Sequence, residues 1–149
     1  MRLAVDANVL IAELPRVRGR KLVKNPGLNL FIAAKAWEEA VYELPGKIDR
    51  IIRQSGMSSA DGKAFLEACL ALVLERVEIV EQSSYLNWRE QALLRIPRDP
   101  GDWPTVALAL SQDMAIWTND QDFFGCGLPV WTTETLLAFL ESNLLSDTP

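Results

Sequence analysis

Short apolar runs alternate with amphipathic segments from one end of the chain to the other. Runs of four to six residues that are apolar, or that alternate between apolar and polar, predict buried strands. They occupy residues 2–6, 28–33, 77–81, 114–118 and 129–132. Between them, apolar residues recur at the three- and four-residue spacing of a helix. This alternation predicts an α/β protein, a single-domain α/β/α sandwich over residues 1–149 with a mostly parallel, about five-stranded central sheet.

Prolines and glycines predict where the helices break. Pro15 is expected to end or kink the helix that follows the first strand. In the long amphipathic segment 34–55, Pro45 and Gly46 are expected to interrupt the helix. Residues 145–149 are expected to form a tail beyond the last helix.

Acidic residues stand where predicted strands end and where one helix begins. Asp6 ends the first strand, Asp120 follows the fourth, and Asp102 is expected to cap the helix that leads into the fourth strand. Each alone is explained as a helix cap or a turn former. The carboxyl ends of parallel strands open on one edge of the sheet, so these carboxylates are expected to crowd together there. Such crowding favours a neutralising cation, and oxygen ligands without His or Cys favour Mg²⁺ or Mn²⁺.

The composition narrows the chemistry further. The chain has no histidine, which excludes Ser-His-Asp and Cys-His catalysis, histidine acid–base chemistry and most zinc sites. A carboxylate cluster with one or two hard cations can still hydrolyse a phosphodiester. No apolar run is long enough to cross a bilayer, and Asp6 lies where a signal peptide would be apolar, so a cytoplasmic protein is expected.

The charge distribution limits where a nucleic acid could bind. The net charge of −5 argues against nonspecific attraction, so any such contact must be local. Basic residues gather in the segment "PRVRGRKLVK", residues 15–24. This segment is either the solvated face of a helix or a contact for phosphates, and the sequence leaves both open.

Four motifs together resemble the PIN-domain family. They are "VDANVLI" (5–11), "WEEAVYEL" (37–44), "DPGDWPTVALAL" (99–110) and "WTNDQDFF" (117–124), in the order and spacing of that family. The resemblance covers residues 3–137 and implies a metal-dependent ribonuclease, in many members the toxin of a toxin–antitoxin pair. It also implies Mg²⁺ or Mn²⁺ as cofactor, an RNA substrate, a possible antitoxin partner and a homodimer.

The resemblance assigns a role to each matching residue. The implied catalytic metal ligands are Asp6, Glu39, Asp102 and Asp120, with Asp122 as a further ligand at the rim. The implied supporting residues are Asn8, Thr118, Glu43 and Asp99, of which Glu43 is the second choice to Glu39 for the helix acid. Apart from the family motifs, the charge distribution and the place of Trp103 beside Asp102 give the candidate nucleic-acid contacts Arg16, Arg18, Arg20, Lys21 and Trp103.

Other functions fit the same motifs less well. A phosphoacceptor receiver domain needs a Lys after a late strand, and no Lys follows Lys63. A haloacid-dehalogenase-type phosphatase needs a second Asp two residues after the first, where Asn8 stands. A catalytically inactive PIN-fold RNA-binding or scaffold module remains the alternative to the nuclease.

Overall fold

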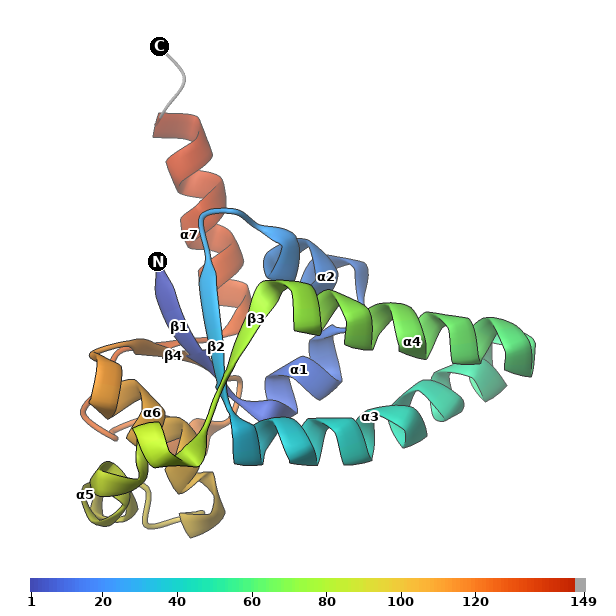
Figure 1. The fold of residues 1–149 in the computed structure, drawn as a ribbon. Coiled ribbons are helices and arrows are strands. Elements are labelled where there is room, and N and C mark those ends of the chain that lie inside the picture. The colour runs from blue at the N-terminus through green and yellow to red at the C-terminus, as the bar shows by residue number, and fades with distance from the viewer. Residues whose placement is uncertain (147–149) are drawn as a thin grey trace.

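The chain folds around one parallel sheet (Figure 1). The structure is a computed structural model, and it describes residues 1–146. The strands are β1 (Arg2–Val5), β2 (Asn29–Ala33), β3 (Val77–Val80), β4 (Ala115–Trp117) and β5 (Val130–Trp131). Their order is β3-β2-β1-β4-β5, and every neighbouring pair is parallel. The predicted α/β/α sandwich is therefore confirmed, with a sheet that is parallel throughout. The first and fourth strands are neighbours, which brings the ends of β1 and β4 together.

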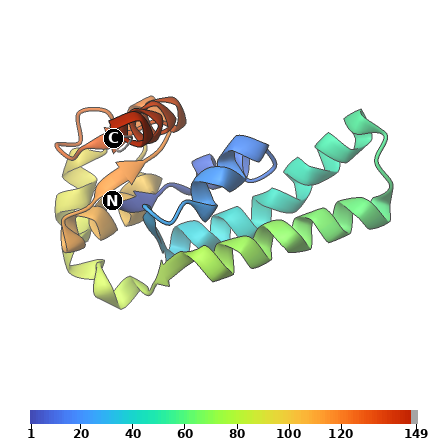
Figure 2. The ribbon, with the colours of Figure 1, turned by 90° about the horizontal axis from the view of Figure 1, so that it is seen from above.

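Seven α-helices flank this sheet within residues 1–146. They are α1 (Ala7–Glu13), α2 (Val17–Lys24), α3 (Ala34–Ser55), α4 (Ser59–Arg76), α5 (Arg89–Arg95), α6 (Trp103–Gln112) and α7 (Thr133–Ser146). Helix α6 packs against β1, β2 and β4. Helices α3 and α4 form a hairpin that projects from the body of the molecule (Figure 2). No helix in this part of the chain is both long and apolar enough to cross a membrane.

The core lies on both sides of the central strands. Leu3, Ala4 and Val5 of β1 have no exposed surface, which is expected for a strand covered on both faces. Helix α6 contributes a run of buried apolar residues from Val106 to Ala109. Burial of apolar surface is the dominant driving force for folding, and here it packs α6 against β1.

Two helix boundaries test the expectations drawn from proline. The break at Pro15 is confirmed, since α1 ends at Glu13 and α2 begins at Val17. The expected interruption at Pro45 is wrong, because α3 runs unbroken through it. The buried positions of α3 are Ala36, Ala40, Leu44 and Ile48, and their regular spacing continues past the proline. Packing of this face against α1 and α4 outweighs the local cost of proline and glycine.

The end of the chain differs from the expectation of a tail over residues 145–149. Helix α7 continues to Ser146, so the first two of these residues belong to it. Residues 147–149 lie outside the described residues.

Candidate metal centre

Asp6 lies at the carboxyl end of β1, between the ends of its two neighbouring strands. Its side chain is 2% exposed. Thr118, just past β4, donates its hydroxyl hydrogen to Asp6 Oδ2 at 2.9 Å. The backbone N–H of Asn8 donates to Asp6 Oδ1 at 3.4 Å, a long bond that also caps α1. Asp6 is thus both the helix cap and a buried carboxylate of the site, and the two readings are compatible.

The segment after β4 forms a turn that also presents a carboxylate. The Asp120 backbone N–H donates to Thr118 Oγ1 at 3.0 Å, and Asp120 Oδ1 accepts from the Asp122 N–H at 2.9 Å. Thr118 is fully buried and joins Asp6 to Asp120 through its one hydroxyl. The turn accounts for only one oxygen of Asp120, which leaves its other oxygen available to a ligand.

Asp102 directly precedes α6, but its side chain does not cap that helix, contrary to the expectation. Asp99 instead accepts from the Gly101 N–H at 3.1 Å and begins a short 3₁₀ turn. Within the described residues, Asp102 Oδ2 is buried and has no hydrogen-bond partner. A buried carboxylate oxygen without a partner is costly, so this atom is suited to bind a cation.

Electrostatics link the acids into one cluster. Desolvation, reinforced by the charges of Asp6, Asp99, Asp120 and Glu39, raises the pKa of Asp102 to about 7. Desolvation also raises the pKa of Asp6 to about 6, opposed by its hydrogen bonds from Thr118 and Asn8. Both values exceed the ordinary range of an aspartate, which means that the cluster resists being fully ionised without a cation.

Among the acids of α3, Glu39 is the one whose charge raises the pKa of the buried aspartates. Its charge acts on both Asp6 and Asp102, whereas Glu43 acts on Glu39. Partial desolvation and then the charge of Glu43 raise the pKa of Glu39, and Lys35 lowers it. This arrangement favours Glu39 over Glu43 as the acid on α3.

The remaining predicted polar residues lie at the rim or act through the backbone. Asp122 is partly exposed and lies 3.9 Å from the guanidinium of Arg98. Asn8 contacts Asp6 through its backbone N–H, and Asp99 adds to the charge near Asp102.

The sequence-based expectation for Trp103 needs correction. Its side chain is only 5% exposed and packs beside Tyr85, with the ring centroids 5.9 Å apart. Lys35 and Arg89 lie 5.7 and 5.4 Å from the centre of the same ring. No open face is left for a base, because the apolar start of α6 draws this ring into the core.

The basic segment on α2 is partly used inside the protein. Arg18 donates to both carboxylate oxygens of the buried Glu13, at 2.8 and 3.0 Å. Arg20 donates to the Leu14 carbonyl at 2.9 Å and covers the ring of Phe65. These two arginines therefore hold α2 in place and are less available to a phosphate.

Two residues that support the site were missed by the sequence analysis. Asn119 and Thr133 join the turn after β4 to the start of α7: the Thr133 N–H donates to Asn119 Oδ1 at 2.8 Å, and Asn119 Nδ2 donates to Thr133 Oγ1 at 3.2 Å. Thr133 Oγ1 also accepts from the indole N–H of Trp117 at 3.1 Å. The only signal in the sequence is a pair of polar residues after each of two strands, which is also typical of ordinary turns.

The donor atoms of the cluster suit a hard cation, but their present arrangement does not yet form a binding site. All of its side-chain ligands would be carboxylate oxygens, the preferred donors for Mg²⁺ and Mn²⁺. The unpartnered Asp102 Oδ2 supports the fit. Within residues 1–146, however, no group of three or more acidic or cysteine side chains could hold an ion as it stands. Metal binding would therefore require the carboxylates to draw together.

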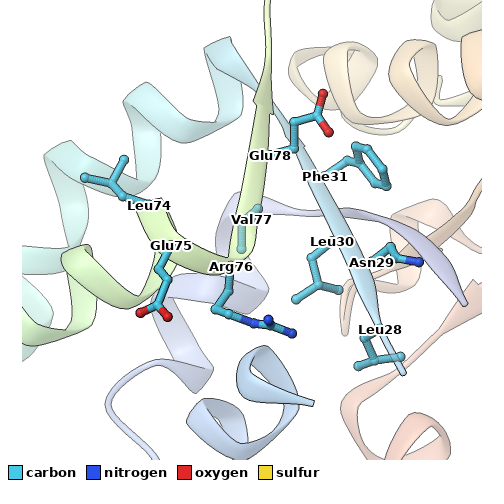
Figure 3. Close-up of a pocket in the computed structure, with 9 residues that line it drawn as sticks. All are labelled: Leu28, Asn29, Leu30, Phe31, Leu74, Glu75, Arg76, Val77 and Glu78. Carbon is cyan, nitrogen blue, oxygen red and sulfur yellow. The ribbon is translucent and has the colours of Figure 1, made fainter. Parts of the chain in front are cut away.

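A hollow elsewhere on the molecule is unrelated to this cluster. It has a volume of about 340 Å³ and lies where β2 and β3 begin (Figure 3). Asp6 and Asp120 follow the carboxyl ends of β1 and β4, so the hollow lies at the other end of the parallel strands. Its walls include Phe31, Leu74 and Glu78. Arg76, also in its lining, is bonded to the carbonyls of Val23 and Asn25.

Comparisons with known proteins agree with the fold. Residues 4–141 match the sequence model of a family described as "PIN domain". A solved structure, "Crystal Structure of FitAcB from Neisseria gonorrhoeae", is similar with a TM-score of 0.57 and 17% sequence identity. The similarity covers 90% of this chain and 99% of that one, and at this identity it bears on the fold alone. Among curated proteins, none is matched by the sequence.

Proposed function

The chain belongs to the PIN-domain family, and from this premise we propose that it is a Mg²⁺- or Mn²⁺-dependent endoribonuclease. PIN domains are generally nucleases that use divalent metals. The observation that carries the proposal is the meeting of Asp6, Asp102, Asp120 and Glu39 in one electrostatic cluster, with one buried oxygen of Asp102 unpartnered. These are the four acids that the family resemblance names.

The protein's own residues would prepare the cluster for a cation. Asp6, Asp102, Asp120 and Glu39 would hold Mg²⁺ or Mn²⁺, with Asp122 at the rim. Thr118 orients Asp6 through its donated hydrogen bond and the Asp120 backbone by accepting one. When bound, such an ion lowers the pKa of a water and stabilises charge on the phosphate. Because the pKa of Asp102 is about 7, a large part of the metal-free protein carries a proton there at neutral pH, and ion binding would release it.

Two cations beside the acids would favour an anionic substrate. Lys35 lies close enough to Glu39 to lower its pKa, and Arg98 faces Asp122 from the rim. Their positions support an approach of the RNA backbone to the acids, because they offset some of the negative charge around these carboxylates.

A PIN-fold RNA-binding or scaffold module without activity is the second candidate. It is favoured by the absence, in residues 1–146, of a preformed group of ligands for an ion. The role of toxin, with an antitoxin as partner, is the finer part of the main proposal. It would be tested by whether expression of the chain arrests growth and whether the Asp6→Asn variant does not.

The decisive experiment is cleavage of end-labelled RNA, single-stranded and hairpin, in Mg²⁺, Mn²⁺ or EDTA. We expect cleavage with either ion and none in EDTA. The Asp120→Asn variant should be slower by more than about 100-fold, since changes in the outer shell of a metal site already cost about 10–100-fold.

Asp113→Asn is the matched control for this experiment. It makes the same chemical change at an exposed residue that ends α6, where the backbone φ of 51° suits asparagine well. Its activity should equal that of the wild type. Cleavage that persists in EDTA or in Asp120→Asn would overturn the proposal. If neither RNA is cleaved, the inactive RNA-binding or scaffold module becomes the favoured function.

A further inference from the structure

The exposed side of α3 carries a row of residues that leads away from the acids. Beyond Glu39 and Glu43 come Lys47, Arg50 and Arg53, each three or four positions further on. Residues at this spacing lie on one side of a helix. The row from Glu39 to Arg53 extends about 20 Å at 1.5 Å per residue, and it changes from acidic to basic on the way.

Two adjoining hollows follow this row. The first, of about 470 Å³, is lined by Ile11, Tyr42, Glu43, Gly46, Lys47 and Arg50. The second, of about 320 Å³, is lined by Gly46, Asp49, Arg50 and Arg53. Because they share Gly46 and Arg50, they form one groove, the α3 groove, which begins at Glu43 beside the metal centre.

Gly46 gives the groove its depth at the point where the hollows meet. A Cβ added there would have no atom within 4 Å, so the position is open space. Glycine inside a helix costs about 0.5–1 kcal/mol relative to alanine. Neither packing nor backbone conformation requires glycine here, and the residue makes best sense as part of the groove's shape.

The cations of the α3 groove are free to bind a ligand. Within residues 1–146, the side chains of Lys47, Arg50 and Arg53 make no hydrogen bond or ion pair with the protein. In contrast, Arg18 and Arg20 of α2 are both bonded internally. Asp49 is the one acid on the wall of the second hollow, which leaves the positive charge in excess there.

Tyr42 adds an aromatic face at the end of the groove next to the acids. Its side chain is 87% exposed, so the ring is accessible to a ligand. An exposed aromatic ring beside a line of cations is the combination by which proteins bind single-stranded nucleic acid.

We propose that the α3 groove binds the single-stranded part of an RNA substrate, with Tyr42 stacking on an unpaired base and Arg50 and Arg53 contacting phosphates. The choice of RNA as ligand rests on the proposed function. Lys47 adds charge between the base and the two phosphates. The strand would run from the metal centre outward along the projecting α3–α4 hairpin (Figure 2).

The test is fluorescence-anisotropy binding of a labelled single-stranded RNA in EDTA, where no cutting is needed. We expect the Arg50→Gln/Arg53→Gln variant to bind at least about ten-fold more weakly. The slope of log affinity against log salt should fall by about 1.4, since each phosphate contact on a single strand contributes about 0.7. Tyr42→Ala should bind the RNA between about five-fold and 100-fold more weakly, and Tyr42→Phe should retain the affinity of the wild type.

Two further variants separate shape and site from charge alone. Gly46→Leu fills the groove without changing any charge, and it should also weaken binding. Lys21→Gln/Lys24→Gln removes the same amount of charge from exposed positions on α2. This helix belongs to the basic segment that the sequence analysis gave as a possible contact for phosphates. A greater loss in this α2 variant than in the α3 variant would overturn the inference, as would a wild type that binds no RNA.

The outcome is distinguishable from failure of the nuclease proposal. If no RNA is cut in Mg²⁺ or Mn²⁺ but the α3 variants lose binding, the groove stands and the nuclease does not. Light scattering on each variant supplies one more check. If the α3 variants lower the molar mass and leave RNA binding intact, the face is an interface between copies of the chain and the inference is wrong.

Discussion

At the scale of single residues, Asp102 is an acid whose surroundings oppose its ionisation. Its Oδ2 is buried without a partner, and four neighbouring carboxylates oppose its ionisation. Asp6, in contrast, has a partner. The hydroxyl of Thr118 favours the charged form of the Asp6 carboxylate and limits the rise of its pKa. The site therefore combines one carboxylate that is already satisfied with one that is not.

These raised pKa values predict how stability changes with pH in the metal-free protein. Asp6 titrates at about 6 and Asp102 at about 7, against 3.8 ordinarily, so between these limits the native state binds more protons than the unfolded chain. The free energy of unfolding should therefore fall as pH rises from about 4 to about 7. Urea unfolding in EDTA at pH 5 and pH 8 measures this.

Asp102→Asn should remove much of this pH dependence. The variant cannot ionise, so it should be more stable than the wild type at pH 8, by about 1–2 kcal/mol after allowance for screening by water at this half-buried group. Asp113→Asn is again the control. If the free energy of unfolding of Asp102→Asn falls between pH 5 and pH 8 as much as that of the wild type, the pKa of Asp102 is not raised.

At the scale of elements, two glycines on different helices have opposite surroundings. Gly19 of α2 lies directly against the backbone of Glu13, where α1 ends, and a Cβ there would collide with the Glu13 carbonyl. The ion pair between Glu13 and Arg18 crosses the same corner. The corner between α1 and α2 thus depends on a close backbone approach, whereas Gly46 of α3 has open space around it.

The contrast predicts opposite effects for the same substitution. Gly19→Ala should lower the free energy of unfolding by about 1–3 kcal/mol, because a rigid backbone atom must move to make room. Gly46→Ala should raise it by about 0.5–1 kcal/mol through better helix propensity. Chemical denaturation of both variants at one pH checks the pair. A stable Gly19→Ala protein would mean that α2 can shift away from α1 without loss.

At the scale of the whole molecule, folding brings together acids from four separate parts of the chain. Asp6 follows β1, Glu39 lies on α3, Asp102 precedes α6 and Asp120 follows β4. Their mutual repulsion opposes folding, so an ion that binds only the native arrangement should stabilise the molecule as a whole.

This linkage predicts a metal-dependent melting temperature. Mg²⁺ or Mn²⁺ should raise the Tm, and an ion at 100 times its Kd contributes about 2.7 kcal/mol. The rise should be larger at pH 8 than at pH 5.5, since protons compete for Asp6 and Asp102 at the lower pH. Asp6→Asn should abolish most of it. Differential scanning fluorimetry measures these Tm shifts. If the ion raises the Tm of the wild type and of Asp6→Asn equally, it binds elsewhere.

The order of elements and the strand-end acids were readable in the sequence because both follow from local patterns. Apolar alternation and helical spacing distinguish strands from helices over a few residues, and Asp6 and Asp120 stand immediately after apolar runs. The break at Pro15 is also local, since α1 ends just before it. Parallel strands then bring these two acids to one edge, whatever the order of the other strands.

Only the tertiary structure decided the features that depend on neighbours distant in the sequence. Helix α3 continues through Pro45 because its buried face packs on α1 and α4, and Trp103 is buried because Tyr85, Lys35 and Arg89 surround it. The same holds for the pairing of β1 with β4, which sets Asp6 against Thr118. Desolvation and packing are properties of a filled interior, and a chain pattern of a few residues carries no record of which side chains will fill it.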